Sequence, residues 1–225
     1  MQTNKSSFLK FTAISAILMM FIIPTQVLVF VLIPPPDSVL GFYELFQESA
    51  LKGLLSLDLL YLLNNLFLIP IYIALYMTLK KNSPTWSLLA LILAVIGIAT
   101  YYPSNPAFEF LTLAKQYDLS TNPNDQVALL GAGEALLAGY TGTAFNAYYV
   151  LNALSLFVFS GLMFQSKLYT KTTSVFGLIA AIFMVIPSTA GLLGLIFSLL
   201  SLIPWTIFLI LLVKTYLRPE DVLEI

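Results

Sequence analysis

The sequence contains no cysteine and no histidine, and only 9% of its residues are charged. The absence of cysteine excludes disulfides, thiolate nucleophiles and cysteine-ligated iron–sulfur clusters. The absence of histidine excludes histidine-ligated haem and histidine-based catalytic triads, and the two absences together remove nearly every zinc site. We therefore predict no cofactor, no metal site and no enzymatic activity.

The low content of charged residues is accompanied by a high content of hydrophobic residues. They make up 59% of the 225 residues, and the mean hydropathy is +0.92. A soluble domain usually carries about 25% charged residues, and a core of this size could not bury so much apolar surface. The net charge of −1 also argues against nucleic-acid binding, which needs a basic surface. The composition predicts an integral membrane protein.

Six apolar runs are separated by polar, proline-rich or glycine-containing segments, the longest of which lies between the third and fourth runs. Each is a candidate spanning helix, because about 20 apolar residues cross a hydrocarbon core roughly 30 Å thick. The predicted spans are residues 11–33, 54–79, 86–101, 144–164, 175–186 and 192–213. The predicted fold class is therefore all-α, a polytopic transmembrane helical bundle with about six spans, and we treat residues 1–225 as a single transmembrane domain.

Residues 103–142, between the third and fourth predicted spans, carry two signals for the start of a helix. Asn105 and Asn122 each precede a proline, the pattern of an N-cap residue followed by proline in the first turn. We expect two short, outward-facing interfacial helices that form a cap over the bundle. Gly139 and Gly142 mark the predicted break before the fourth span.

Basic residues are distributed unevenly between the connections. With the N-terminus in the cytoplasm, only Lys52 and Lys115 lie outside. The inner segments then contain the other eight basic residues: Lys5, Lys10, Lys80, Lys81, Lys167, Lys171, Lys214 and Arg218. The positive-inside rule therefore predicts that both termini are cytoplasmic.

Asp58 is the only acidic residue well inside a predicted span. At about 100° per residue, it shares one stripe of the second span with Tyr61, Asn65 and Tyr72. Such a group needs partners, because an unpaired ionisable side chain in hydrocarbon costs several kcal/mol. One interpretation is a cavity wall where Asp58 binds a cation or a proton. The other is an interhelical hydrogen-bond pin, or an acid at the membrane interface, without any ligand.

The fourth predicted span carries a second polar ridge, formed by Asn146, Tyr149 and Asn152. These side chains suit a ligand cavity, but they also suit helix–helix hydrogen bonding, which we favour. Glu134 lies in an apolar setting between glycine and alanine, where it either joins the cavity or is solvated at the outer surface. The candidate ligand-binding residues are thus Asp58, Tyr61, Asn65, Tyr72, Glu134, Asn146, Tyr149 and Asn152.

Two interpretations of the function remain open. The first is a membrane protein that binds a small ligand, lipid or cation in an outward-facing polar cavity between helices. The alternative is a non-catalytic accessory or structural protein that docks a membrane protein partner through its outer cap. The predicted partners are membrane lipids together with a small ligand or such a protein, and no nucleic acid.

Three segments near the fourth span carry a family resemblance. They are Tyr102-Pro-Ser-Asn-Pro-Ala-Phe108, Gln116-Tyr117, and the run from Ala132-Gly-Glu-Ala through Tyr140-Thr-Gly-Thr-Ala-Phe145. They resemble a family of small prokaryotic multi-pass membrane proteins catalogued as a domain of unknown function, of the four-three-eight-six type. The resemblance extends from the second span to the sixth. It implies a prokaryotic plasma membrane and supports the architecture, and it implies nothing about mechanism.

Overall fold

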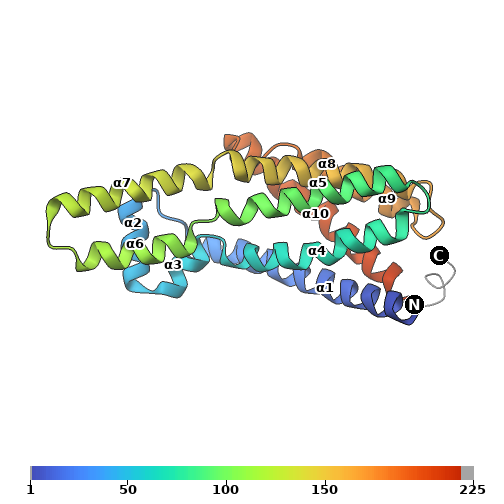
Figure 1. The fold of residues 1–225 in the computed structure, drawn as a ribbon, viewed down its shortest axis with the longest axis horizontal. Helices are drawn as coiled ribbons and strands as arrows, with labels where there is room; N and C mark the ends of the chain where they lie inside the picture. The colour runs from blue at the N-terminus through green and yellow to red at the C-terminus, as the bar shows by residue number, and fades with distance from the viewer. Residues whose placement is uncertain (1, 219–225) are drawn as a thin grey trace. The chain divides into compact units, whose positions relative to one another are not determined.

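The structure is a computed structural model that describes residues 2–218. Within that range the secondary structure is helical, and no strand occurs. In chain order the helices are α1 (Gln2–Leu32), α2 (Val39–Glu48), α3 (Ala50–Ser56), α4 (Leu59–Leu79), α5 (Pro84–Ser104), α6 (Ala107–Leu119), α7 (Pro123–Tyr140), α8 (Thr143–Met163), α9 (Lys171–Met184) and α10 (Gly191–Tyr216). Figure 1 shows their arrangement.

Five stretches within the described residues are long and apolar enough to cross a membrane. They are Lys5–Leu32, Leu59–Leu79, Pro84–Leu119, Pro123–Met163 and Gly191–Tyr216. The predicted span 175–186 corresponds to α9, an apolar helix of only 14 residues. At about 1.5 Å per residue, α9 is shorter than the hydrocarbon core. These helices confirm the predicted all-α, membrane-spanning fold class.

The predicted span 54–79 is wrong in one respect, because it is not a single helix. α3 ends at Ser56 and α4 begins at Leu59. Between them Asp58 has a φ of 63°, a left-handed conformation that aspartate tolerates better than most residues. The Ser56 hydroxyl bonds the Gly53 carbonyl at 2.9 Å within the last turn of α3. Asp58 therefore does not lie on the helical stripe of Tyr61, Asn65 and Tyr72.

Both predicted helix starts between residues 103 and 142 occur, one of them shifted. Asn122 caps α7, its side chain accepting from the Asn124 N–H, and Pro123 is the first helical residue. α6 begins at Ala107, one residue later than predicted, because the Asn105 side chain accepts from the Ala107 N–H at 3.1 Å. The predicted break before the fourth span is confirmed, since α7 ends at Tyr140 and α8 begins at Thr143.

The chain divides into two compact units, and we describe each by itself. The first, unit 1, comprises the described residues 2–21, 65–100 and 146–218. Its helices pack closely: the Tyr72 and Phe159 rings stack with centroids 6.0 Å apart, and a Cβ at Gly177 would overlap the Ser160 hydroxyl.

Unit 1 also contains a buried chain of hydroxyl groups. The Thr78 and Tyr169 oxygens lie 2.7 Å apart, and those of Tyr169 and Tyr216 lie 2.8 Å apart. The chain joins α4, the α8–α9 connection and the end of α10, so these three segments are held together by polar as well as apolar contacts.

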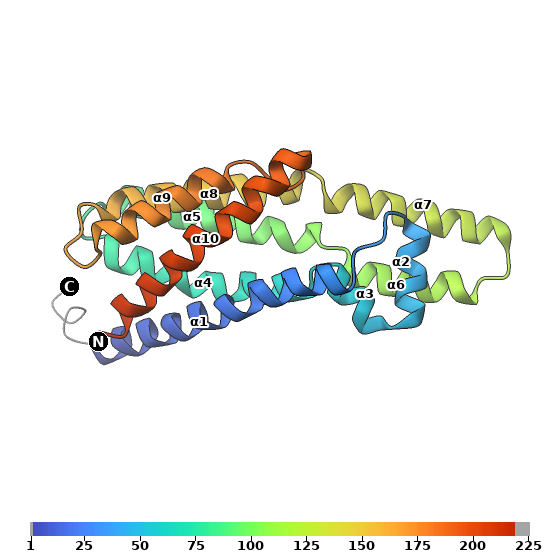
Figure 2. The ribbon, with the colours of Figure 1, turned by 180° about the vertical axis from the view of Figure 1, so that it is seen from behind.

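Unit 2 comprises residues 22–64 and 101–145. Here α2 lies across α6 and α7, as Figure 2 shows. The Tyr43 ring of α2 contacts Phe110 of α6, and its hydroxyl donates to the Leu129 carbonyl of α7 at 2.7 Å. The buried core is Val39, Phe42, Tyr43, Phe46, Leu57, Ala107, Phe110 and Ala114. That the two units act as the single domain predicted from the sequence stays a prediction.

Candidate binding site at the break between α3 and α4

The break between α3 and α4 leaves backbone groups that no helix satisfies, and two amide side chains bond them. The last carbonyls of α3 and the first N–H groups of α4 have no intrahelical partner. The buried Gln26 side chain of α1 donates to the Leu55 carbonyl at 3.0 Å and accepts from the Leu60 N–H at 3.3 Å. Asn105 donates to the Leu57 carbonyl at 2.7 Å. The break is therefore pinned in one conformation.

Asp58 is the residue before α4, a position from which an aspartate side chain normally caps the helix by accepting a hydrogen bond from a backbone N–H. Its own carbonyl accepts from the N–H groups of Tyr61 and Leu62, but its carboxyl makes no capping bond within the described residues. Gln26 bonds the Leu60 N–H instead. The left-handed φ of 63° removes Asp58 from the extended conformation that side-chain capping uses. The carboxyl is thereby free for other interactions.

The Asp58 carboxyl is buried, with only 6% of the residue exposed. One oxygen, Oδ2, accepts a hydrogen bond from the hydroxyl of Tyr140 at the end of α7. The other, Oδ1, is buried and has no hydrogen-bond partner among the described residues. A buried polar atom without a partner costs about 1–3 kcal/mol, more when it is charged.

The Asp58 carboxyl lies just before the candidate span Leu59–Leu79. Burial raises its pKa from the ordinary value of 3.8 to about 6, and the Tyr140 hydrogen bond opposes that rise. Neither burial nor the Tyr140 hydrogen bond supplies a positive charge that would balance an ionised Asp58. A carboxyl of this kind exchanges its proton close to neutral pH, and it is ionised without a counter-charge above that value.

The predicted candidate residues fall into the two units. Asp58, Tyr61 and Glu134 belong to unit 2, and the remaining five belong to unit 1. Tyr61 is half-buried and Glu134 is exposed. A cavity formed by all eight residues would need both units, and it stays a prediction.

The five candidates of unit 1 make contacts within that unit. Tyr149 bonds Ser198 of α10 at 3.1 Å, and Asn146 accepts from Thr189 in the α9–α10 turn. Asn152 donates to the Tyr148 carbonyl at 2.8 Å, and its buried Oδ1 has no hydrogen-bond partner among the described residues. Asn65 and Tyr72 are buried. The Tyr149 bond joins α8 to α10, the Asn146 bond joins α8 to a turn, and the Asn152 bond lies within α8; none of them tests ligand binding.

Sequence reasoning missed Gln26 and Tyr140 as site residues, and it assigned Asn105 only to a helix cap. A signal for Gln26 was present, because it is the only amide in the apolar run 11–33. An amide in such a setting needs partners. Tyr140 had no comparable signal, since its partner lies 82 residues away.

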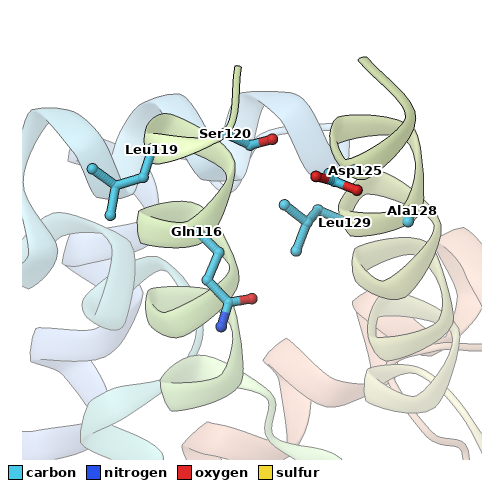
Figure 3. A pocket seen from close by; sticks show the side chains of 6 residues that line it. All are labelled: Gln116, Leu119, Ser120, Asp125, Ala128 and Leu129. Carbon is cyan, nitrogen blue, oxygen red and sulfur yellow. The ribbon is translucent and has the colours of Figure 1, made fainter. Parts of the chain in front are cut away.

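Unit 2 also has an open surface depression of about 500 Å³ between the end of α6 and the start of α7. Figure 3 shows its lining from both helices. The residues are Gln116, Leu119, Ser120, Asp125, Ala128 and Leu129. Gln126 donates to the Ser120 carbonyl at 2.9 Å and closes the turn between the helices. The depression is lined by one carboxyl, one amide and one hydroxyl beside three apolar side chains, and it has no buried polar group that points to a ligand.

One protein-family model matches residues 8–215, nearly the whole chain, and its description is Domain of unknown function (DUF4386). No curated protein and no solved structure matches the chain. Among the described residues, no group of three or more aspartate and glutamate side chains is placed to hold a metal ion.

Proposed function

The chain belongs to the family described as Domain of unknown function (DUF4386), and from its geometry we propose that it is a membrane protein that binds a small monovalent cation at the Asp58 carboxylate. The single observation that carries this proposal is the buried, unpartnered Oδ1 of Asp58. The Leu55 and Leu57 carbonyls and the Leu60 N–H of the break are bonded by Gln26 and Asn105, whereas this carboxyl oxygen stays open to a ligand.

A cation is the ligand class that fits this carboxylate. Within unit 2 the only basic residues are Lys52 and Lys115, and Lys52 pairs with Glu48 on the surface. A buried carboxylate without a counter-charge is destabilised by desolvation, and a bound cation offsets that cost. A divalent metal would need more oxygen ligands from carboxylates than this site supplies. We therefore propose a monovalent cation.

A proton competes with the cation for the same carboxyl. Since burial raises the pKa of Asp58 to about 6, the carboxyl is mostly ionised at pH 7.5 and mostly protonated at pH 5. Cation affinity should therefore fall about tenfold for each pH unit below 6. Binding of the cation therefore releases the proton from the carboxyl, and protonation of the carboxyl releases the cation.

The test is thermal unfolding of the detergent-solubilised protein at pH 7.5 in Na⁺, K⁺ or the bulky cation N-methyl-D-glucamine, at constant ionic strength. At least one of the small ions should raise the unfolding temperature of wild type in a saturable way, because ligands that bind only the native state stabilise it. Asp58→Asn should abolish this dependence while leaving the basal fold intact.

The matched control is Asp37→Asn, the same chemical change at an exposed acid of unit 2. It should keep the cation dependence of wild type. Equal unfolding temperatures of wild type in all three cations would overturn the proposal, as would a cation dependence that survives Asp58→Asn.

We further propose that the protein is not an enzyme, because the sequence lacks cysteine and histidine and the site holds a single carboxyl. The alternative function, docking of a protein partner through residues 103–142, stays a prediction. Phe108, Leu119 and Val127 are exposed on α6 and α7, but this exposure does not identify a partner.

From the family resemblance we propose a prokaryotic plasma membrane as the location, and from the basic-residue distribution we propose that both termini lie in the cytoplasm. Cysteines introduced singly at Asn82 and Asn122 of this cysteine-free chain test the orientation. An impermeant maleimide added to intact cells should label position 122 and not position 82. Labelling of both positions from outside would contradict the topology.

A further inference from the structure

Charge separates sharply between the two units. The described residues of unit 1 contain no acidic residue, whereas unit 2 contains eight acidic residues and two basic ones. The basic residues of unit 1 are Lys5, Lys10, Lys80, Lys81, Lys167, Lys171, Lys214 and Arg218. They are the same eight residues that the positive-inside rule assigns to one side of the membrane.

These residues lie near helix ends that meet at one end of unit 1. The start of α1, the α4–α5 turn, the α8–α9 connection and the end of α10 lie together there in both ribbon views (Figures 1 and 2). Seven of the eight basic residues are exposed, and Lys5 is half-buried. This end therefore presents a positively charged surface without a carboxylate among its described residues.

Three lysines of this surface are close enough to repel one another. The ammonium group of Lys5, from the start of α1, is repelled by those of Lys81 and Lys80, from the α4–α5 turn. Lys80 also lies 5.6 Å from the centre of the Tyr76 ring. The ion pair found between described residues is Lys52–Glu48 of unit 2, so no described carboxylate neutralises the three lysines. Like charges gathered in this way favour a bound anion.

The location of the lysines on membrane-spanning helices indicates which kind of anion they bind. α1 and α4 contain candidate membrane spans, Lys5–Leu32 and Leu59–Leu79, and the lysines lie at the ends of these spans. A span of this length holds its terminal residues at the level of the lipid headgroups. There a lysine contributes about fivefold in affinity for an anionic membrane surface, corresponding to about 1 kcal/mol.

We propose that Lys5, Lys80 and Lys81 form a binding surface for the phosphate of an anionic phospholipid headgroup. The surface is independent of Asp58, which lies in the other unit. Three lysines together should favour an anionic over a zwitterionic lipid by up to about a hundredfold, and screening at high salt should reduce that preference.

Trp86 provides a probe at the same end of the unit, because it lies in the first turn of α5 and is 57% exposed. Brominated lipids quench tryptophan fluorescence on contact. In full-length protein reconstituted into mixed vesicles, brominated phosphatidylglycerol should quench more than brominated phosphatidylcholine at equal mole fraction. Trp86→Phe identifies the part of the signal from this end, since the other tryptophan, Trp205, is buried.

The variant K5Q/K80Q/K81Q should lose the preference for phosphatidylglycerol, and 0.5 M NaCl should weaken it in wild type. The matched control K52Q/K115Q removes the two lysines of unit 2 and should retain it. Equal quenching by both lipids in wild type, or a preference that survives the triple variant, would overturn the proposal. Loss of the preference on adding 10 mM inorganic phosphate, but not chloride of equal ionic strength, would also overturn it by identifying free phosphate as the ligand.

Discussion

The Tyr140 hydroxyl donates a hydrogen bond to Oδ2 of Asp58, and this bond joins the end of α7 to the break between α3 and α4. The two residues are 82 positions apart in the sequence. Because Tyr140 engages one carboxyl oxygen, the orientation of the Asp58 side chain is set while its second oxygen stays open. The bond thus links the position of α7 to the charge state of one buried acid.

The first prediction concerns the pH dependence of stability. The pKa of Asp58 is raised on folding from 3.8 to about 6, so folding takes up a proton in this range. The charged form destabilises the native state above pH 7, and this cost disappears as the pH falls towards 4. The difference corresponds to about 3 kcal/mol at most. Chemical denaturation in cation-free buffer at pH 4 and pH 7.5 should show that the stability gained by Asp58→Asn relative to wild type is much larger at the higher pH.

The second prediction concerns Tyr140→Phe. The Tyr140 hydrogen bond lowers the pKa of Asp58, so its removal should raise that pKa further. The pH window over which wild-type stability changes should therefore move upward. In the background of Asp58→Asn the same tyrosine substitution should produce no such movement. A shift of equal size in both backgrounds would show that Tyr140 acts on another group.

The third prediction concerns Gln26. Gln26→Leu leaves the Leu55 carbonyl and the Leu60 N–H without their partner, and each unsatisfied buried group costs about 1–3 kcal/mol. The variant should unfold at a clearly lower temperature in detergent. Gln116→Leu is the control, because Gln116 is exposed on α6. Similar unfolding temperatures of the two variants would argue against a pinned break.

The fourth prediction compares two glycines of α7. A Cβ at Gly133 would overlap Val39 and lie 2.7 Å from the Tyr43 hydroxyl oxygen, whereas a Cβ at Gly131 would meet nothing within 4 Å. Gly133→Ala should therefore lower stability by about 1–3 kcal/mol. Gly131→Ala should be neutral or slightly stabilising, because alanine favours a helix interior. The pair tests the packing of α2 on α7 by the same thermal measurement.

The sequence predicts the helices of this fold better than their breaks. Apolar run length located the apolar helices, though not all of them are long enough to span a membrane, and the Asn-Pro pairs located α6 and α7, because these signals are local. The break at Asp58 was not predicted, since Leu54 to Leu60 is apolar on both sides of it and its left-handed backbone depends on partners elsewhere in the fold. Gln26 and Asn105 stabilise that break from distant segments.

The candidate site was predicted only in part for the same reason. Asp58 was identified because it is the only acidic residue well inside a predicted span, where an ionisable group needs partners. Its actual partner, Tyr140, is one of 12 tyrosines, and nothing local distinguishes it from the others. The charge separation between the units, by contrast, follows directly from the sequence, since it coincides with the predicted inner and outer segments.

Infrared difference spectroscopy tests the central claim, cation binding at Asp58, most directly. A protonated carboxyl has a C=O stretching band that disappears on ionisation. At pH 6, where about half of the Asp58 carboxyls hold a proton, the stabilising cation should bleach this band in wild type and in Asp37→Asn, but not in Asp58→Asn. A wild-type spectrum in which the cation leaves every carboxyl band unchanged would contradict the account.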